Sequence, residues 1–290
     1  MTIAYLIHIG IIIGIHSILA MSLQLAFGFT GLINLGHIAL FAIGAYSSAL
    51  ITLNGIPFSV AILLSAVISG LFGMLLGFFT QRIQSDYLAL ATLAFSYLIH
   101  AFLLNTTSLT NGPLGLAGIP KPYIFGFSID NNLSYLILTY AFAFFVYIFL
   151  KSLINSPFGN ALQATRDNEL ALQILGKNSF KIKIIAFMCS GFLAGLAGIL
   201  YAHFMTFIDP ASFTIMQLIP IVCIVIMGGL ASLKGTILAT IILVLISESL
   251  RFISFPVSVV GPLTQIIYAL VLCIILIKKP KGFFGKVTLK

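Results

Sequence analysis

The feature that most constrains this chain is a succession of apolar stretches that carry almost no charge. A helix needs roughly 20 apolar residues to cross the bilayer core, and only helices and closed barrels satisfy their backbone there. The first charged residue is Arg82, and 7% of the 290 residues are charged against 60% that are hydrophobic. Soluble domains carry about 25% charged residues, so the composition excludes a soluble or disordered protein.

The apolar runs and their polar breaks predict an all-α fold, a polytopic transmembrane helical bundle of about 8–10 spans. We expect one domain over residues 1–290. The uncharged, glycine-rich segment 28–36 separates the first two spans, as either a tight turn or a re-entrant break within the bilayer. The nine expected spans lie near 5–27, 31–53, 57–79, 87–105, 133–154, 183–206, 214–230, 236–253 and 258–277.

The basic residues predict the orientation, because Lys and Arg concentrate in cytoplasmic loops. With the C-terminus in the cytoplasm, 12 of the 14 basic residues fall on the inner side, and only Lys121 and Arg251 fall outside. We therefore expect loop 155–182 to be cytoplasmic. The net charge of +8 is explained by this bias, and no nucleic-acid partner is expected.

The sequence lacks the motifs of catalysis and of metal binding. Its three cysteines and five histidines are scattered, without the spacing of a zinc site or a disulfide framework. It has no GxxxxGK[ST] phosphate loop. We expect no enzyme activity, no metal and no cofactor. Charged residues in the spans lie near their ends, where Glu248 and Arg251 are spaced to pair, and the lack of a mid-span acid argues against an ion-coupled carrier.

The long inner loop has the pattern of two short amphipathic helices. Ser156 and Pro157 fit the cap and first position of the first helix. Asn168 fits the cap of the second, with Gly176 at its end. Helices this short need a surface to pack on, which is either the bundle and membrane or a groove in a cytoplasmic partner. The apolar faces are Phe158, Ala161, Leu162 and Thr165, then Leu170, Ala171, Ile174 and Leu175.

This loop, Ser156-Pro-Phe-Gly-Asn-Ala-Leu-Gln-Ala-Thr-Arg-Asp-Asn-Glu-Leu-Ala-Leu-Gln-Ile-Leu-Gly176, resembles the cytoplasmic coupling segment of branched-chain amino acid ABC importer permeases, in particular their M-type subunit. Six further blocks are similar to that family in the same order, within roughly residues 20–280. They are Gly28-Phe-Thr-Gly-Leu-Ile-Asn-Leu-Gly-His37, Asp86-Tyr-Leu-Ala-Leu-Ala-Thr-Leu93, Asn111-Gly-Pro-Leu-Gly-Leu-Ala-Gly118, Ala194-Gly-Leu-Ala-Gly-Ile-Leu-Tyr-Ala202, Asp209-Pro-Ala-Ser-Phe213 and Met227-Gly-Gly-Leu-Ala-Ser-Leu-Lys-Gly235.

The resemblance implies a multi-pass permease of a bacterial inner membrane that moves branched-chain or related hydrophobic amino acids. It implies a second permease subunit in a heterodimer, two cytoplasmic ATPase subunits that use the ATP, and an extracytoplasmic solute-binding protein. A urea or short-amide permease of the same family stays open as an alternative, and a stand-alone secondary carrier is the rival from another class. The expected ATPase-coupling residues are Ser156, Pro157, Phe158, Gly159, Ala161, Leu162, Arg166, Asn168, Glu169, Ala171, Leu175 and Gly176.

Two features of the spans bear on transport. Glycines spaced along one face of spans 57–79 and 183–206 predict close helix contact, which we interpret as an interface able to shift between two arrangements. A few polar side chains in apolar surroundings are candidates to line the translocation path. These are Asn34, His37, Thr92, Ser96 and Tyr97.

Overall fold

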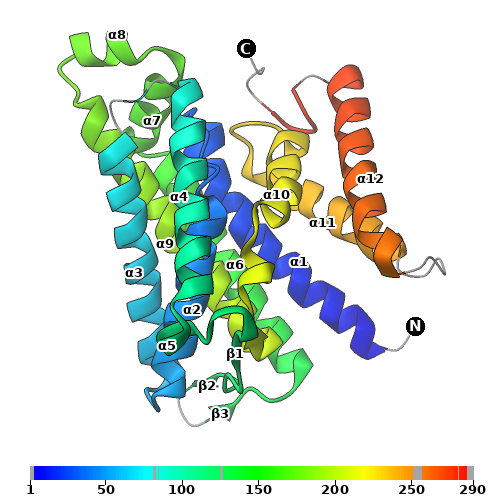
Figure 1. The fold of residues 1–290 in the computed structure, drawn as a ribbon. Coiled ribbons are helices and arrows are strands. Elements are labelled where there is room, and N and C mark those ends of the chain that lie inside the picture. The colour runs from blue at the N-terminus through cyan, green and yellow to red at the C-terminus, as the bar shows by residue number, and fades with distance from the viewer. Residues whose placement is uncertain are drawn as a thin grey trace.

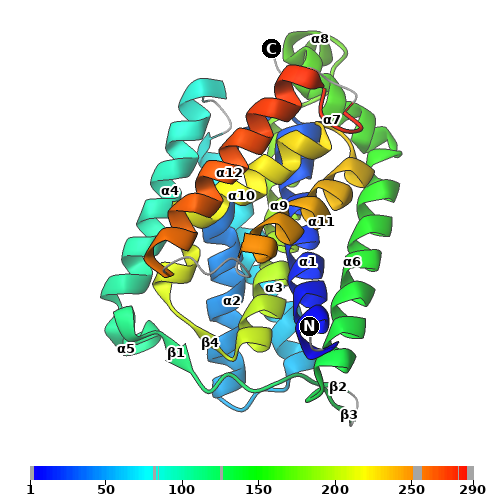
Figure 2. The same ribbon diagram turned by 90° about the vertical axis from the view of Figure 1, so that its right-hand side faces the viewer.

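The computed structural model describes residues 3–80, 83, 85–124, 127–250, 257–279 and 281–285. Within these ranges long helices form one bundle, with short elements at its two ends (Figures 1 and 2). The long helices are α1 (Ile3–Gln24), α2 (His37–Leu53), α3 (Phe58–Thr80), α4 (Ser85–Asn105), α6 (Asn132–Ile154), α9 (Ser179–Met205), α10 (Ile215–Gly228), α11 (Leu233–Leu250) and α12 (Val257–Lys278).

These long helices follow the nine expected spans in order, so the predicted all-α polytopic bundle is confirmed. Over the described residues, seven segments are long and apolar enough to cross a membrane, and α2 is a shorter apolar helix of 17 residues. One expected boundary is wrong: the second span does not begin at residue 31. Helix α2 begins at His37, and residues 31–36 before it are not helical.

Glycines bring α9 into backbone contact with α2 and α3, as the spacing predicted. A Cβ on Gly44 of α2 would overlap the backbone of Gly195, and one on Gly73 of α3 would lie 3.2 Å from the Cα of Gly191. Ser69 of α3 hydrogen-bonds to both other helices. Its Oγ lies 2.7 Å from the Leu40 carbonyl oxygen of α2 and 2.8 Å from the Gly191 carbonyl oxygen of α9. Helix α9 is therefore the centre of the bundle.

One end of the bundle holds α5 (Thr107–Thr110), the 3₁₀ turn η2 (Gly112–Leu114) and four two-residue strands (Figure 1). Strand β1 (Leu116–Ala117) pairs antiparallel with β4 (Phe207–Ile208), which leads into the 3₁₀ turn η3 (Pro210–Phe213). Strands β2 (Tyr123–Ile124) and β3 (Phe127–Ser128) form a second antiparallel pair. The connection between α4 and α6 is thus tied to the connection between α9 and α10.

The opposite end holds α7 (Pro157–Asp167), α8 (Glu169–Ile174) and the last turn of α12 (Figure 1). The lysines of loop 155–182 therefore share one end of the bundle with Lys278, Lys279 and Lys281. The expected partner of Glu248, Arg251, lies outside the described residues. Glu248 accepts a hydrogen bond of 2.6 Å from the Tyr5 hydroxyl, which links α11 to the first turn of α1.

Candidate functional site

The coupling loop begins and turns where its capping residues require. The Ser156 Oγ accepts a bond of 3.4 Å from the Gly159 amide, with Pro157 as the first residue of α7. Asn168 leaves the helical region, and its Oδ1 accepts a bond of 3.0 Å from the Ala171 amide at the start of α8. The two predicted helices and their caps are therefore confirmed.

The inner face of α7 packs on the bundle. Gly159, Leu162 and Thr165 are buried, and a Cβ on Gly159 would overlap the carbonyl oxygen of Ile154 at the end of α6. Phe158 and Ala161 are half-buried. This face of the expected ATPase-coupling set therefore holds the loop to the permease itself.

Arg166 connects the loop to the interior. Its Nη1 donates a bond of 2.9 Å to the Gly28 carbonyl, and its Nε donates one of 2.8 Å to Asp167. Its aliphatic stem covers Gly31, where a Cβ would lie 2.8 Å from the Arg166 Cγ. Arg166 is one of the ATPase-coupling residues expected from the sequence, and nothing in the sequence identifies Gly28 as its partner.

The outer face of α8 carries an exposed apolar surface. Leu170 is 72% exposed, Ile174 85% and Leu175 77%. Leu172 is buried and fixes α8 to the bundle. We call these three side chains, Leu170, Ile174 and Leu175, the α8 patch. Most of their surface is accessible to water. The expected coupling residues Pro157, Asn168, Ala171 and Gly176 are also exposed.

An ion pair joins α8 to α9. The Lys183 Nζ lies 2.7 Å from the Glu169 Oε2, and the Lys183 side chain is largely buried. Glu169 therefore has a partner within the chain. A pair that is partly shielded from solvent holds its geometry better than an exposed one.

The junction between α1 and α2 is a buried break. A π-helical turn, η1 (Leu25–Phe29), ends α1, and Gly31 follows with a φ of +73° that favours glycine. Gly28, Phe29 and Thr30 are buried. The segment is therefore a mostly buried connection between α1 and α2, and its nature as a tight turn or a re-entrant break within the bilayer stays a prediction.

Three of the expected path residues meet at this break. The Leu35 amide donates a bond of 3.0 Å to the Thr92 Oγ1, and the Ser96 Oγ donates one of 2.8 Å to the Leu35 carbonyl. The Gly36 amide donates one of 3.0 Å to the Asn34 Oδ1. Two side chains of α4 thus replace the helical bonds that the break removes.

His37 lies just beyond, in a network of three helices. Its Nε2 is 2.8 Å from the Ser22 Oγ of α1, and the Ser190 Oγ of α9 donates a bond of 2.8 Å to the Ser22 carbonyl. His37 is completely buried. Tyr97, in contrast, is 55% exposed and takes no part in either group.

A second break separates α10 from α11 and touches the first. Gly229 has a φ of +94° and Ala231 one of +61°. The Gln24 Nε2 at the end of α1 donates a bond of 2.7 Å to the Gly229 carbonyl. Neither Gln24 nor this contact was identified from the sequence. The sequence does hold one sign that the two breaks are related, because Gly31-Leu-Ile-Asn-Leu35 is similar to Gly229-Leu-Ala-Ser-Leu233.

Of the six buried side-chain atoms that lack a hydrogen-bond partner among the described residues, three lie beside the two breaks. Within the described residues, Gln24 Oε1, Asn34 Nδ2 and His37 Nδ1 are buried and make no hydrogen bond. Such groups are costly unless something satisfies them. They are the donors and acceptors that this region offers to a solute or to water. In the same described ranges no group of three or more His, Cys, Asp or Glu side chains is placed to hold a metal.

Comparison with known proteins identifies the family of this chain. The model of the family described as "branched-chain amino acid transport system / permease component" matches residues 5–276. The chain belongs to this family of permeases. The family is one of transport proteins, and the chain is a multi-pass membrane protein within it.

Curated relatives cover much of the chain. The high-affinity branched-chain amino acid transport system permease proteins LivM of Salmonella typhimurium and Escherichia coli are 34% and 35% identical over 82% of this chain. A probable LivM of Methanocaldococcus jannaschii is 24% identical over 93% of this chain and 90% of the relative. The match spans 61% of the length of the first two relatives.

Proposed function

We propose that the chain is the permease subunit of an ABC importer that moves branched-chain or related hydrophobic amino acids across a bacterial inner membrane. Membership of the permease family and the names of the LivM relatives support the substrate class. The partners are a second permease subunit, two cytoplasmic ATPases that hydrolyse the ATP, and an extracytoplasmic binding protein. The permease itself carries out no catalysis and holds no cofactor.

The single observation that carries the proposal is the α8 patch. A helix of six residues has too few bonds to be stable alone, yet α8 exposes Leu170, Ile174 and Leu175 together. An exposed apolar helix face fits a hydrophobic groove of a partner. The lysines beside it support a cytoplasmic position for this end of the bundle. The partner is therefore the cytoplasmic ATPase.

The two breaks supply the moving part. A broken helix exposes polar backbone only where it lines a cavity or is buried in protein. Arg166 connects α7 to the first break through Gly28, and Gln24 connects the first break to Gly229 of the second. Motion imposed on α8 and α7 by the ATPase thus reaches both breaks through two hydrogen bonds. Asn34, His37, Thr92 and Ser96 line the path, and Tyr97 faces away from it.

The docking role is tested by placing a charge in the α8 patch. Ile174→Glu and Leu175→Glu are expected to reduce ATPase co-purification at least tenfold, because a carboxylate in an apolar groove loses its hydration. Leu114→Glu is the matched control, since Leu114 is 82% exposed at the opposite end. Normal ATPase recovery with both α8 variants would overturn the docking role.

The substrate is tested by uptake. The reconstituted complex with its binding protein is given labelled leucine, isoleucine, valine or urea. ATP-dependent leucine uptake that exceeds urea uptake by tenfold or more is the expected result. Preferential urea uptake would establish the short-amide alternative, and uptake without ATP would establish a secondary carrier.

A further inference from the structure

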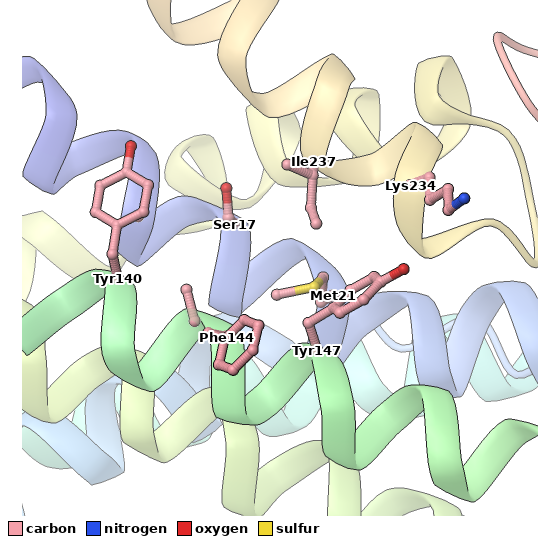
Figure 3. A pocket seen from close by; sticks show the side chains of 9 residues that line it. Ser17, Met21, Tyr140, Phe144, Tyr147, Lys234 and Ile237 are labelled. Carbon is pink, nitrogen blue, oxygen red and sulfur yellow. The ribbon is translucent and has the colours of Figure 1, made fainter.

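A groove runs along the outside of the bundle between α6 and α11, with α1 at its floor. Its volume is about 380 Å³, and Figure 3 shows the side chains that line it. Small residues of α1 and α6 keep it open, and aromatic rings of α6 form one wall. The lining residues are Gly14, Ser17, Met21, Tyr140, Ala143, Phe144, Tyr147, Lys234 and Ile237.

The one cation among the lining residues, Lys234, lies at one end of the groove. Tyr147 lies toward the same end, whereas Tyr140 lies at the other end and Ser17 lies between them (Figure 3). Lys234 is in the first turn of α11, and Tyr147 is two helical turns closer than Tyr140 to the end of α6 that leads into α7. Lys151 follows Tyr147 by one turn on the same face of α6. This end of the groove is therefore the cytoplasmic one.

Among the residues that the structure describes, the cations at this end have no anionic partner. The ion pairs formed among the described residues involve Arg166 with Asp167 and Lys183 with Glu169. Lys234 and Lys151 take part in neither, and both are exposed. An apolar groove that ends in unpaired lysines at the level of the inner leaflet complements a ligand with an apolar tail and an anionic head.

We propose that this groove binds an anionic phospholipid of the inner leaflet. One acyl chain lies between α6 and α11 over Gly14 and Ala143. Its phosphate contacts the Lys234 ammonium, with Tyr147 as a hydroxyl donor and Lys151 as a second cation.

The test measures the lipid retained by the purified importer complex in nanodiscs of phosphatidylethanolamine and phosphatidylglycerol. Lys234→Gln removes the cation, and Ala143→Phe fills the groove. Both are expected to lower bound phosphatidylglycerol at least fivefold, with no effect on phosphatidylethanolamine. Lys177→Gln is the matched control, because Lys177 is an exposed lysine of the same end beyond α8 and is expected to stay within twofold of wild type.

Cross-linking separates a lipid from a protein occupant. A photoreactive residue at position 147 is expected to capture phosphatidylglycerol from the nanodisc. Capture of the second permease subunit would overturn the proposal, as would equal retention of the two lipids by wild type or unchanged retention in Lys234→Gln. If Ala143→Phe does not assemble, Lys234→Gln and the cross-link decide the outcome.

Discussion

The Arg166 guanidinium donates a hydrogen bond of 2.9 Å to the carbonyl oxygen of Gly28, which is 138 residues away in the chain. Arg166 lies in α7, and Gly28 lies in the π-helical turn that ends α1. The loop that we propose as the docking element and the break after α1 are therefore in direct contact. On this proposal, a change in the position of α7 is transmitted to the break.

Arg166→Ala is expected to uncouple ATP hydrolysis from transport. The substitution removes a charge-assisted bond of about 1.5–3 kcal/mol while leaving the α8 patch intact. ATPase co-purification should stay normal, whereas leucine transported per ATP hydrolysed should fall about tenfold or more. Lys177→Ala, a change of an exposed cation nearby, serves as the control. Coupled transport at the wild-type level in Arg166→Ala would contradict the connection.

Glu169→Lys is expected to impair the complex through Lys183 rather than through the ATPase. It places two cations where the structure has an ion pair of 2.7 Å. The double variant Glu169→Lys, Lys183→Glu restores opposite charges, and we expect it to recover at least half of the stimulated ATPase activity. No recovery in the double variant would indicate that Glu169 acts on a partner directly.

Ser96→Ala and Tyr97→Phe should differ sharply although they are neighbours. Ser96 is the donor to the Leu35 carbonyl, and a buried carbonyl left without a donor costs about 1–3 kcal/mol. Leucine uptake is expected to fall severalfold in Ser96→Ala and to be unchanged in Tyr97→Phe, because Tyr97 is largely exposed. Uptake assays at equal membrane expression measure this, and the reverse ranking would refute the placement of the path.

Gly44→Ala is expected to destabilise the bundle, because its Cβ would overlap the backbone of Gly195. Overpacking costs about 1–3 kcal/mol, and two backbones that carry the contact have little room to move. Gly261→Ala in α12 is the control, since its Cβ would meet nothing within 4 Å. Thermal unfolding in detergent should show a lower midpoint for Gly44→Ala alone. Equal unfolding midpoints for Gly44→Ala and Gly261→Ala would contradict the close backbone contact between α2 and α9.

Local chemistry made much of this structure predictable. Apolar length determines a bilayer span without reference to any other helix, which is why nine helices lie where they were expected. Caps are equally local, and Ser156 and Asn168 begin α7 and α8 as predicted. The position of Gly159, in contrast, was not predictable from local sequence. The resemblance to the permease family implied that Gly159 contacts the ATPase, but it packs against Ile154. A large substitution at Gly159 therefore tests folding and not docking.

The sequence by itself determined the helical bundle, the family and the two short helices of loop 155–182, because spacing, hydropathy and caps act within a few residues. Only the tertiary structure decided which face of that loop is free, that segment 28–36 is a buried break, and that Gln24 and Arg166 connect the breaks to each other and to the loop. Those contacts join residues 138 and 205 positions apart, and their geometry depends on how whole helices pack.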